Sequence, residues 1–174
     1  MNTKQIGDIA EQAAALQALK QGWGVLYPIG DNLPYDLVFD VKGILVKIQV
    51  KCAWLDEPSQ NYVVDNRRTK TNRREMVRER YCSSDFDFAL AYISQQDLFY
   101  VFPVNVFIRY GSEIHMVETD KRQRKPQSAS FREAWHLILQ WAAYGETHMR
   151  NLSNSGKPLA GVIPSQALEV SEKV

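Results

Sequence analysis

Four polar side chains, far apart along the chain, are the candidates for chemistry. Glu11 lies in a segment with helical periodicity, Asp36 begins a β-rich run, and Gln49 and Lys51 stand two residues apart in the next such run. Phosphodiester hydrolysis needs divalent cations to bear charge in the transition state and carboxylates on rigid elements to hold those cations. It also needs a cation or base beside the attacking water. Glu11 and Asp36 supply carboxylates, and Lys51 supplies the cation.

The first segment must carry Glu11. We predict a helix from Thr3 to about Gln21, because Thr3 can cap its start and Gly22 can end it. Glu11 falls on a side of this helix that is otherwise small, opposite an apolar stripe of Ile6, Ile9, Ala13 and Leu16; the small residues are Gly7, Ala14, Ala15 and Ala18. Another backbone or a ligand can therefore approach this carboxylate closely. A solvated helix glutamate is the commoner explanation for Glu11 taken alone.

Three β-rich runs follow, and they predict a meander. They span Trp23–Ile29, Tyr35–Val41 and Ile44–Ala53, with turn residues between them. Strand alternation places Asp36, Val38 and Asp40 on the face opposite Leu37, Phe39 and Val41, and it places Lys47, Gln49 and Lys51 opposite Ile48 and Val50. The polar sides of the two strands can therefore face one cleft.

The second half of the chain is predicted to add two strands and two helices. The strands are Phe86–Ile93 and Phe99–Phe102, and a helix is expected around Arg73–Tyr81. A final helix is expected from Ser130, with a capping box to Glu133, to Tyr144 before Gly145. That helix is apolar nearly all round, which favours a subunit interface on its second face. We expect one domain over residues 1–145 and a loosely packed tail over 146–174.

Composition argues against a disordered chain and against a membrane protein. The chain has 174 residues, 45% of them hydrophobic and 24% charged, which is ordinary for one globular domain. It shows neither an apolar run long enough to cross a bilayer nor a secretion signal, so we expect a cytoplasmic protein. Cys52 and Cys82 lack metal-ligand spacing and are predicted to be reduced thiols.

Basic residues gather in two places, although the net charge is only +1. Between residues 67 and 80 there are two acidic residues, Glu75 and Glu79, against seven basic ones: Arg67, Arg68, Lys70, Arg73, Arg74, Arg78 and Arg80. A second group consists of Lys121, Arg122, Arg124 and Lys125. Two such groups on one small domain predict a surface for double-stranded DNA, since they can neutralise several phosphates. A solvated face is the alternative for either group alone.

The order of these motifs resembles a known family, the PD-(D/E)XK homing endonucleases encoded in group I introns of cyanobacteria. The similarity covers about residues 5 to 105, and its segments are Gly7-Asp8-Ile9-Ala10-Glu11, Tyr27-Pro28-Ile29-Gly30-Asp31-Asn32, Tyr35-Asp36-Leu37-Val38, Ile48-Gln49-Val50-Lys51, Asp85-Phe86-Asp87-Phe88-Ala89 and Tyr100-Val101-Phe102-Pro103-Val104. Each motif is weak by itself. All of them in order, at the right spacing, are specific.

The resemblance implies an α/β fold with the restriction-endonuclease-like αβββαβ nuclease core and a C-terminal helix. It implies Mg²⁺ dependence and cleavage of both strands of a long, nearly palindromic DNA target. By position, Asp36 would bind the metal, Glu11 would complete the metal shell and Lys51 would position or activate the water. It also implies a homo-oligomer, a dimer or a tetramer, whose symmetry suits repeated half-sites.

Gln49 departs from the general nuclease pattern, which has a carboxylate there. The amide is neutral, so the site loses one negative charge, although its carbonyl oxygen can still bind Mg²⁺. The intron-encoded branch that the chain resembles also has glutamine at this position.

Other interpretations stay open at this point. Another nuclease with the same core, such as a Holliday-junction resolvase or a restriction-type enzyme, would share all four residues. A catalytically inactive DNA-binding module would explain Gln49 but not the joint presence of Glu11, Asp36 and Lys51. The remaining candidates, Asp40, Asp87, His115, His136 and His148, are predicted to be structural or solvated.

Overall fold

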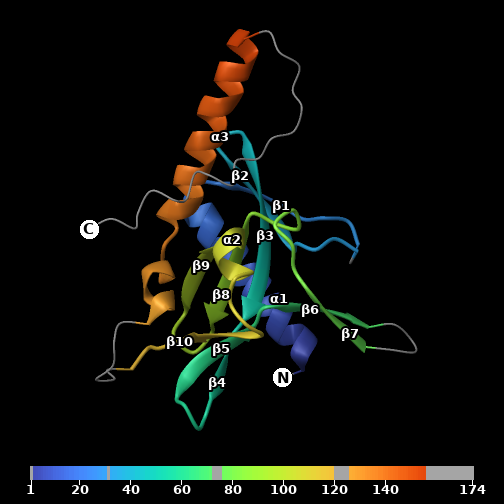
Figure 1. The fold of residues 1–174 in the computed structure, drawn as a ribbon, viewed down its shortest axis with the longest axis vertical. Helices are drawn as coiled ribbons and strands as arrows, with labels where there is room; N and C mark the ends of the chain where they lie inside the picture. Colours follow the sequence, from blue (N-terminus) through green and yellow to red (C-terminus); the bar gives the residue numbers. More distant parts are fainter. Residues whose placement is uncertain (1, 31, 72–75, 120–125, 156–174) are drawn as a thin grey trace.

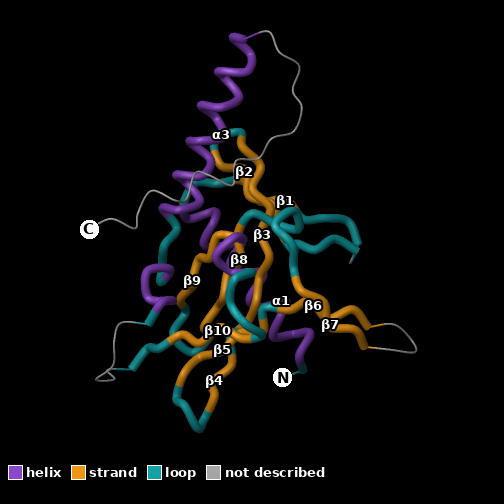
Figure 2. Tube along the Cα trace, viewed as in Figure 1, coloured by secondary structure: helices purple, strands orange, loops and turns teal. Residues whose placement is uncertain are grey.

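The computed structural model describes residues 2–30, 32–71, 76–119 and 126–155 (Figures 1 and 2). Its helices are α1 Thr3–Lys20, α2 Val104–Phe107, the 3₁₀ helix η1 Gln127–Phe131 and α3 His136–Ser155. Its strands are β1 Gly24–Leu26, β2 Leu37–Val41, β3 Ile44–Cys52, β4 Trp54–Asp56, β5 Asn61–Asp65, β6 Arg67–Thr71, β7 Met76–Arg80, β8 Phe88–Ile93, β9 Leu98–Pro103 and β10 Glu113–Met116.

A five-stranded mixed sheet with the order β1-β2-β3-β8-β9 is the centre of the molecule. The β3–β8 pair is parallel, and the other neighbours in this sheet are antiparallel. A parallel pair requires a crossover connection, and here the crossover contains β4 to β7. Strands β4 and β5 form a second sheet with β10, and β6 and β7 form a separate hairpin.

The sheet is buried on both faces. Helices α1 and α3 cover the first face, where Phe39, Ile48 and Leu90 lie in a core with the small residues of α1. The second sheet and α2 cover the other face, where Tyr81, Phe102 and Met116 belong to a separate core. Figure 1 shows α2 in front of the sheet and α1 behind it. The predicted α/β fold is confirmed in this arrangement of sheet and helices.

Helix α1 packs on the sheet through the side that carries its small residues. Its buried residues are Ala10, Ala14, Ala15 and Ala18, which let the helix backbone come close to the strands. The apolar stripe on its other side is exposed, with Ile9 at 43% and Leu16 at 54%. The N-cap is Asn2 rather than Thr3, because the Asn2 side chain accepts the backbone N–H of Gln5 in a capping box.

The predicted meander is confirmed as β1, β2 and β3. Lys42 and Gly43, both at positive φ, form the tight turn between β2 and β3. The carboxylate of Asp40 accepts the backbone N–H of Gly43 at 2.7 Å, so this aspartate has the structural role that its place beside a turn indicated.

The helix expected around Arg73–Tyr81 is wrong. This segment, as far as the structure describes it, is the β6–β7 hairpin, in which Arg67 pairs with Arg80 and Thr71 with Met76. Residues 72–75 lie outside the described residues. The crossover between β3 and β8 therefore consists of strands where the αβββαβ pattern has a helix.

The last helix begins later and ends later than expected. Ser130 belongs to η1, and Glu133 has a positive φ of 49°, so the predicted capping box is wrong. The Glu133 carboxylate instead accepts the backbone N–H of Phe99 at 2.5 Å and Trp135 Nε1 at 2.9 Å. Helix α3 starts at His136 and passes through Gly145 to Ser155, and residues 156–174 of the expected tail lie outside the described residues.

Two smaller expectations concern the cysteines and membranes. Cys52 and Cys82 are free thiols, as predicted. No helix among the described residues is long and apolar enough to cross a membrane.

Two glycines in and after α1 give a matched test of this helix. Gly22 follows the C-cap at φ +77°, with Trp23 N–H bonded to the Ala18 carbonyl, whereas Gly7 lies inside the helix; a Cβ at either position would meet no atom within 4 Å. Gly7→Ala should raise the free energy of unfolding by about 0.5–1 kcal/mol through helix propensity. Gly22→Ala should lower it by about 1–2 kcal/mol through left-handed strain, as measured by urea unfolding. Equal effects of the two changes would contradict this description of the helix end.

Candidate active site

Asp36 and Gln49 meet where β2 and β3 begin to separate. Leu37 pairs with Ile48, so the same register places Asp36 opposite Gln49. The Asp36 Oδ2 atom accepts the backbone N–H of Val50 at 2.7 Å and the side-chain amide of Gln49 at 2.5 Å. The Asp36 carboxylate is thus fixed to the middle of β3 by two donors from that strand.

Lys51 projects from the same face of β3 as Gln49. Their β8 neighbours are the alanines Ala89 and Ala91, whose small side chains leave room for two long polar ones. The Lys51 ammonium donates to the backbone carbonyl of Arg67 at 3.2 Å and lies 5.2 Å from the ring centre of Tyr81. Asp36, Gln49 and Lys51 therefore form one group, as the strand alternation indicated.

Burial dominates the electrostatics of this group. Desolvation raises the pKa of Asp36, opposed by the Val50 N–H and by the charge of Lys51. Desolvation likewise lowers the pKa of Lys51, opposed by the negative charges of Asp36 and then Asp65. The carboxylate and the ammonium thus stabilise each other's charged form at a site that is unfavourable for either charge alone.

Glu11 lies on α1, on the other side of the sheet from the side chains of Gln49 and Lys51. It is half-buried on α1, in the same row as the buried residues Ala14, Ala15 and Ala18. Helix α1 packs on the face opposite Gln49 and Lys51. Within the described residues, no three His, Cys, Asp or Glu side chains form a cluster suited to a metal ion. The metal role of Glu11 therefore stays a prediction.

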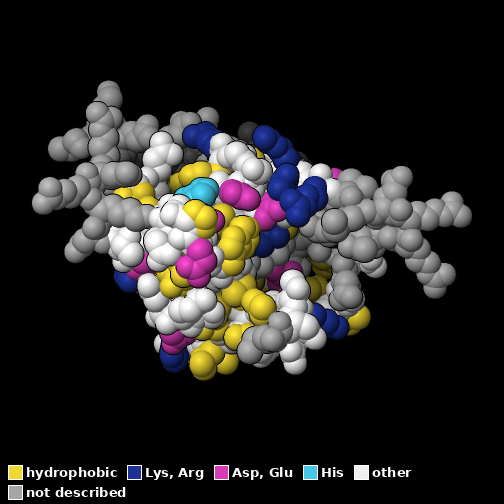
Figure 3. All heavy atoms as spheres, turned by 90° about the horizontal axis from the view of Figure 1, so that it is seen from below, with side chains coloured by type: hydrophobic (Ala, Val, Ile, Leu, Met, Phe, Trp, Pro, Cys, Tyr) yellow, Lys and Arg dark blue, Asp and Glu magenta, His cyan; other side chains and the backbone are white. Residues whose placement is uncertain are grey.

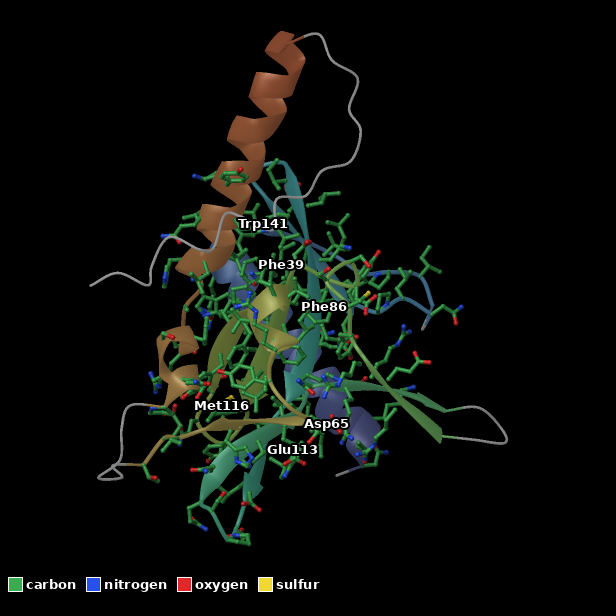
Figure 4. The ribbon with its side chains drawn as sticks, viewed as in Figure 1. Phe39, Asp65, Phe86, Glu113, Met116 and Trp141 are labelled. Carbon is green, nitrogen blue, oxygen red and sulfur yellow. The ribbon has the colours of Figure 1, made fainter. Side chains whose placement is uncertain are left out.

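The basic hairpin begins and ends next to Lys51. The Asp65 carboxylate accepts Arg67 Nε at 3.0 Å and lies 3.4 Å from the guanidinium of Arg78. The first residue of β6, Arg67, pairs with the last residue of β7, Arg80, so this negative charge lies where arginines gather. Arg68 donates to the carbonyls of Asn32 and Leu33 at 3.1 and 3.3 Å, in the segment that leads to Asp36. Figure 4 shows Asp65 at this junction between the second sheet and the hairpin.

The predicted DNA-binding residues separate into three groups. Arg67 and Arg68 are half-buried and make the internal contacts just described, whereas Arg78 and Arg80 are exposed, although Arg78 also contacts Asp65. Seven others are not described in their side chains: Lys70, Arg73, Arg74, Lys121, Arg122, Arg124 and Lys125. Figure 3 shows Lys and Arg side chains gathered on one side of the end of the molecule that is drawn at the bottom of Figure 1.

Sequence reasoning missed Tyr81 and Asp65, which surround Lys51 and the hairpin. Tyr81 is 7% exposed, in a segment expected to be helical, so its position beside Lys51 was not foreseeable from periodicity. Asp65 carries a weak signal, since it is an acid directly before a run of arginines. Only the pairing of Arg67 with Arg80 shows why a negative charge is needed there.

Two comparisons with known proteins gave matches, and a third gave none. A family model described as PD-(D/E)XK endonuclease matches residues 1–138. Among solved structures, the chain is similar to a bacterial homing endonuclease, I-Ssp6803I, with 66% identity and a TM-score of 0.80 over 84% of this chain and 99% of that chain. The search of curated proteins found no match.

Asp87 is a buried carboxylate that accepts the backbone N–H of Lys47 at 2.7 Å, next to the site on β3. Burial raises its pKa, opposed by that hydrogen bond. Ionised Asp87 therefore costs stability, and the cost develops as pH rises from the unfolded to the folded pKa. Asp87→Asn keeps an acceptor for Lys47, so the variant should become more stable than the parent as pH rises from about 3 to 7.

The measurement is urea unfolding across that pH range. Asp8→Asn, on the exposed side of α1, is the control and should show no such trend. A stability difference for Asp87→Asn that stays constant with pH would contradict the assignment of a buried charge.

Proposed function

The chain belongs to the PD-(D/E)XK endonuclease family, and from this premise we propose that it is a homing endonuclease. Its substrate would be a long, nearly palindromic double-stranded DNA, cut in both strands with Mg²⁺. The observation that carries the proposal is the group of Asp36, Gln49 and Lys51 on one strand pair, beside a basic hairpin. The similarity to a homing endonuclease across most of the chain supports the choice within the family.

The residues at hand suit Mg²⁺ bound together with its substrate. Mg²⁺ in nucleic-acid enzymes is commonly held by one or two carboxylates plus phosphate oxygens and waters. Both hydrogen bonds to Asp36 end on Oδ2, so Oδ1 is the atom that would meet a cation. Glu11 would be the second carboxylate. When bound, the metal would stabilise the charge that develops on the phosphate.

Gln49 would have to turn its amide to serve as a ligand. Its nitrogen donates to Asp36 Oδ2 and to the Val50 carbonyl at 3.1 Å, so the nitrogen rather than the oxygen faces the carboxylate. Only the oxygen can bind a cation. Metal binding through Gln49 would therefore exchange these two hydrogen bonds for a coordinate bond.

Lys51 would hold the attacking water or the hydroxide that forms from it. Its ammonium is partly withdrawn from water, which strengthens its interaction with an anion. The hairpin would follow the DNA backbone through Arg78 and Arg80, which lie two residues apart and so share one face of β7. Arg67 and Arg68 would instead support the hairpin from within.

A homo-oligomer, a dimer or a tetramer, would present two such sites to the two DNA strands. On α3, Trp141 is partly buried and packs edge-on against Phe88, whereas Leu139 and Tyr144 are exposed and leave the second face of this helix available. The exposed apolar residues of α1, including Ile9, Leu16 and Leu19, offer a second candidate surface. Exposed apolar stripes of this kind commonly form subunit contacts.

The proposal predicts separable effects on cleavage and binding. Asp36→Asn and Lys51→Met should each abolish cleavage while leaving DNA affinity in place, because neither residue belongs to the basic hairpin. Asp40→Asn and Lys47→Met are matched controls on the same strands, since Asp40 serves the turn and Lys47 bonds to the Ser84 carbonyl. The controls should cleave at the parental rate.

The assay is incubation with Mg²⁺ and plasmids that carry candidate intron-insertion sites, followed by sequencing of the ends. A four-way junction serves as the competing substrate, and binding is measured by gel shift without metal. If the protein cleaves the four-way junction in preference to the plasmid, it is a resolvase and the proposed homing function is wrong. An unchanged rate in Lys51→Met would show that Lys51 has no part in the reaction.

Gln49→Glu tests the missing charge. The change removes an N–H donor and places a second carboxylate against Asp36, so the metal-free protein should lose stability through like-charge repulsion. Cleavage should be kept or improved, with a lower Mg²⁺ concentration at half-maximal rate. A Mg²⁺ titration of cleavage and thermal unfolding without metal give the two readings. Loss of cleavage, or a higher Mg²⁺ concentration at half-maximal rate, would contradict a metal-ligand role for position 49.

A further inference from the structure

The Lys51 ammonium is held by both ends of the β6–β7 hairpin. Its hydrogen-bond acceptor is the carbonyl of Arg67, the first residue of β6, at 3.2 Å. Its aromatic neighbour is Tyr81, the residue directly after β7, with the ammonium over the ring at 5.2 Å from its centre. The two groups that fix the ammonium are thus the two points where the hairpin joins the rest of the molecule.

Tyr81 is itself held firmly. It is buried, and its ring meets Phe86 edge-on at 5.0 Å and Phe107 at 6.2 Å. These rings belong to the core between the central sheet and the second sheet. The ring of Tyr81 therefore has a defined position relative to β3. The Lys51 ammonium, which lies over this ring, is placed by it.

The Arg67 end is equally constrained. Asp65 accepts the backbone N–H of Arg67 at 2.9 Å and also its guanidinium, so the residue that carries the acceptor carbonyl is held by its backbone and by its side chain. Arg68 extends the same connection to the carbonyls of Asn32 and Leu33, close in sequence to Asp36. The end of the hairpin therefore contacts the segments of both Lys51 and Asp36.

We propose that Tyr81 is a positioning residue, whose ring, together with the Arg67 carbonyl, holds Lys51 in its reactive place and couples that place to the DNA-contacting hairpin. The inference rests on the proposed endonuclease function. A cation over an aromatic face is attracted by the ring's quadrupole, more strongly when water is excluded, and the hydroxyl is not needed for it. Because hairpin and lysine share their supports, DNA seated on the hairpin is placed in a fixed relation to Lys51.

Tyr81→Leu and Tyr81→Phe separate the ring from the hydroxyl. At saturating DNA and Mg²⁺, Tyr81→Leu should lower the single-turnover cleavage rate by roughly tenfold, the expected size of one desolvated cation–ring contact, with unchanged DNA affinity. Tyr81→Phe should restore the rate to within about twofold of the parent. Phe131→Leu, which removes a ring packed on Phe102 at 5.0 Å in the same core, is the control for general loss of packing.

A spectroscopic reading makes the test independent of cleavage. The ε-methylene protons of Lys51, assigned by comparison with Lys51→Met, should be shifted upfield by the ring in the parent and in Tyr81→Phe, and should return to ordinary values in Tyr81→Leu. Tyr81→Met, which keeps more of the side-chain volume, replaces the leucine variant where that protein does not fold.

Three results would overturn the proposal. They are an unshifted Lys51 signal in the parent, a rate in Tyr81→Leu no lower than in Phe131→Leu, and a rate in Tyr81→Phe as low as in Tyr81→Leu. A parent protein that shifts the Lys51 signal but cuts no DNA would count against the endonuclease function and leave the placement of Lys51 by Tyr81 standing.

Discussion

Polar side chains on a strand that is buried on both faces set the main constraint on this structure. Strand β3 has neighbours on both sides, and its face toward the second sheet carries Gln49 at 7% exposure and the half-buried Lys51. A buried polar group without partners costs on the order of 1–3 kcal/mol, and a buried charge costs more. Each of these side chains therefore needs a fixed partner. Asp36 satisfies Gln49, while the Arg67 carbonyl and the Tyr81 ring satisfy Lys51.

The same constraint explains why the crossover is unusual. A helix between β3 and β8 would cover the sheet with side chains, but it would offer few backbone acceptors because its carbonyls are bonded internally. The crossover instead ends β5 at Asp65 and begins β6 at Arg67, which leaves the Arg67 carbonyl available to the lysine. The β6–β7 hairpin, which carries the arginines, is thereby bonded directly to Lys51.

Local patterns predicted the parts that local physics decides. The β2–β3 hairpin followed from alternation and the Lys42-Gly43 turn, and this pair alone placed Asp36 near Gln49 and Lys51. The predicted start of α3 was wrong because Glu133 bonds to Phe99 across the fold and to the nearby Trp135, which outweighs its propensity to cap a helix. The helix expected around Arg73–Tyr81 was wrong because this segment has no apolar period that would reveal a strand pair. The counter-ion that permits Arg67 opposite Arg80 also lies outside both strands.

Gln49 shows how the proposed metal site can be stable without a metal ion. Two carboxylates at positions 36 and 49 would repel each other in a buried place, so one would take up a proton and both would lose their fixed geometry. An amide donates to Asp36 instead, and the Val50 N–H and the nearby Lys51 charge oppose the effect of burial on that carboxylate. The gain in metal-free stability has a cost, because a site with one negative charge fewer attracts a metal cation less strongly. In the proposed function, phosphate oxygens of the DNA would supply the missing charge, so the cation would be held well only when the substrate is already in place.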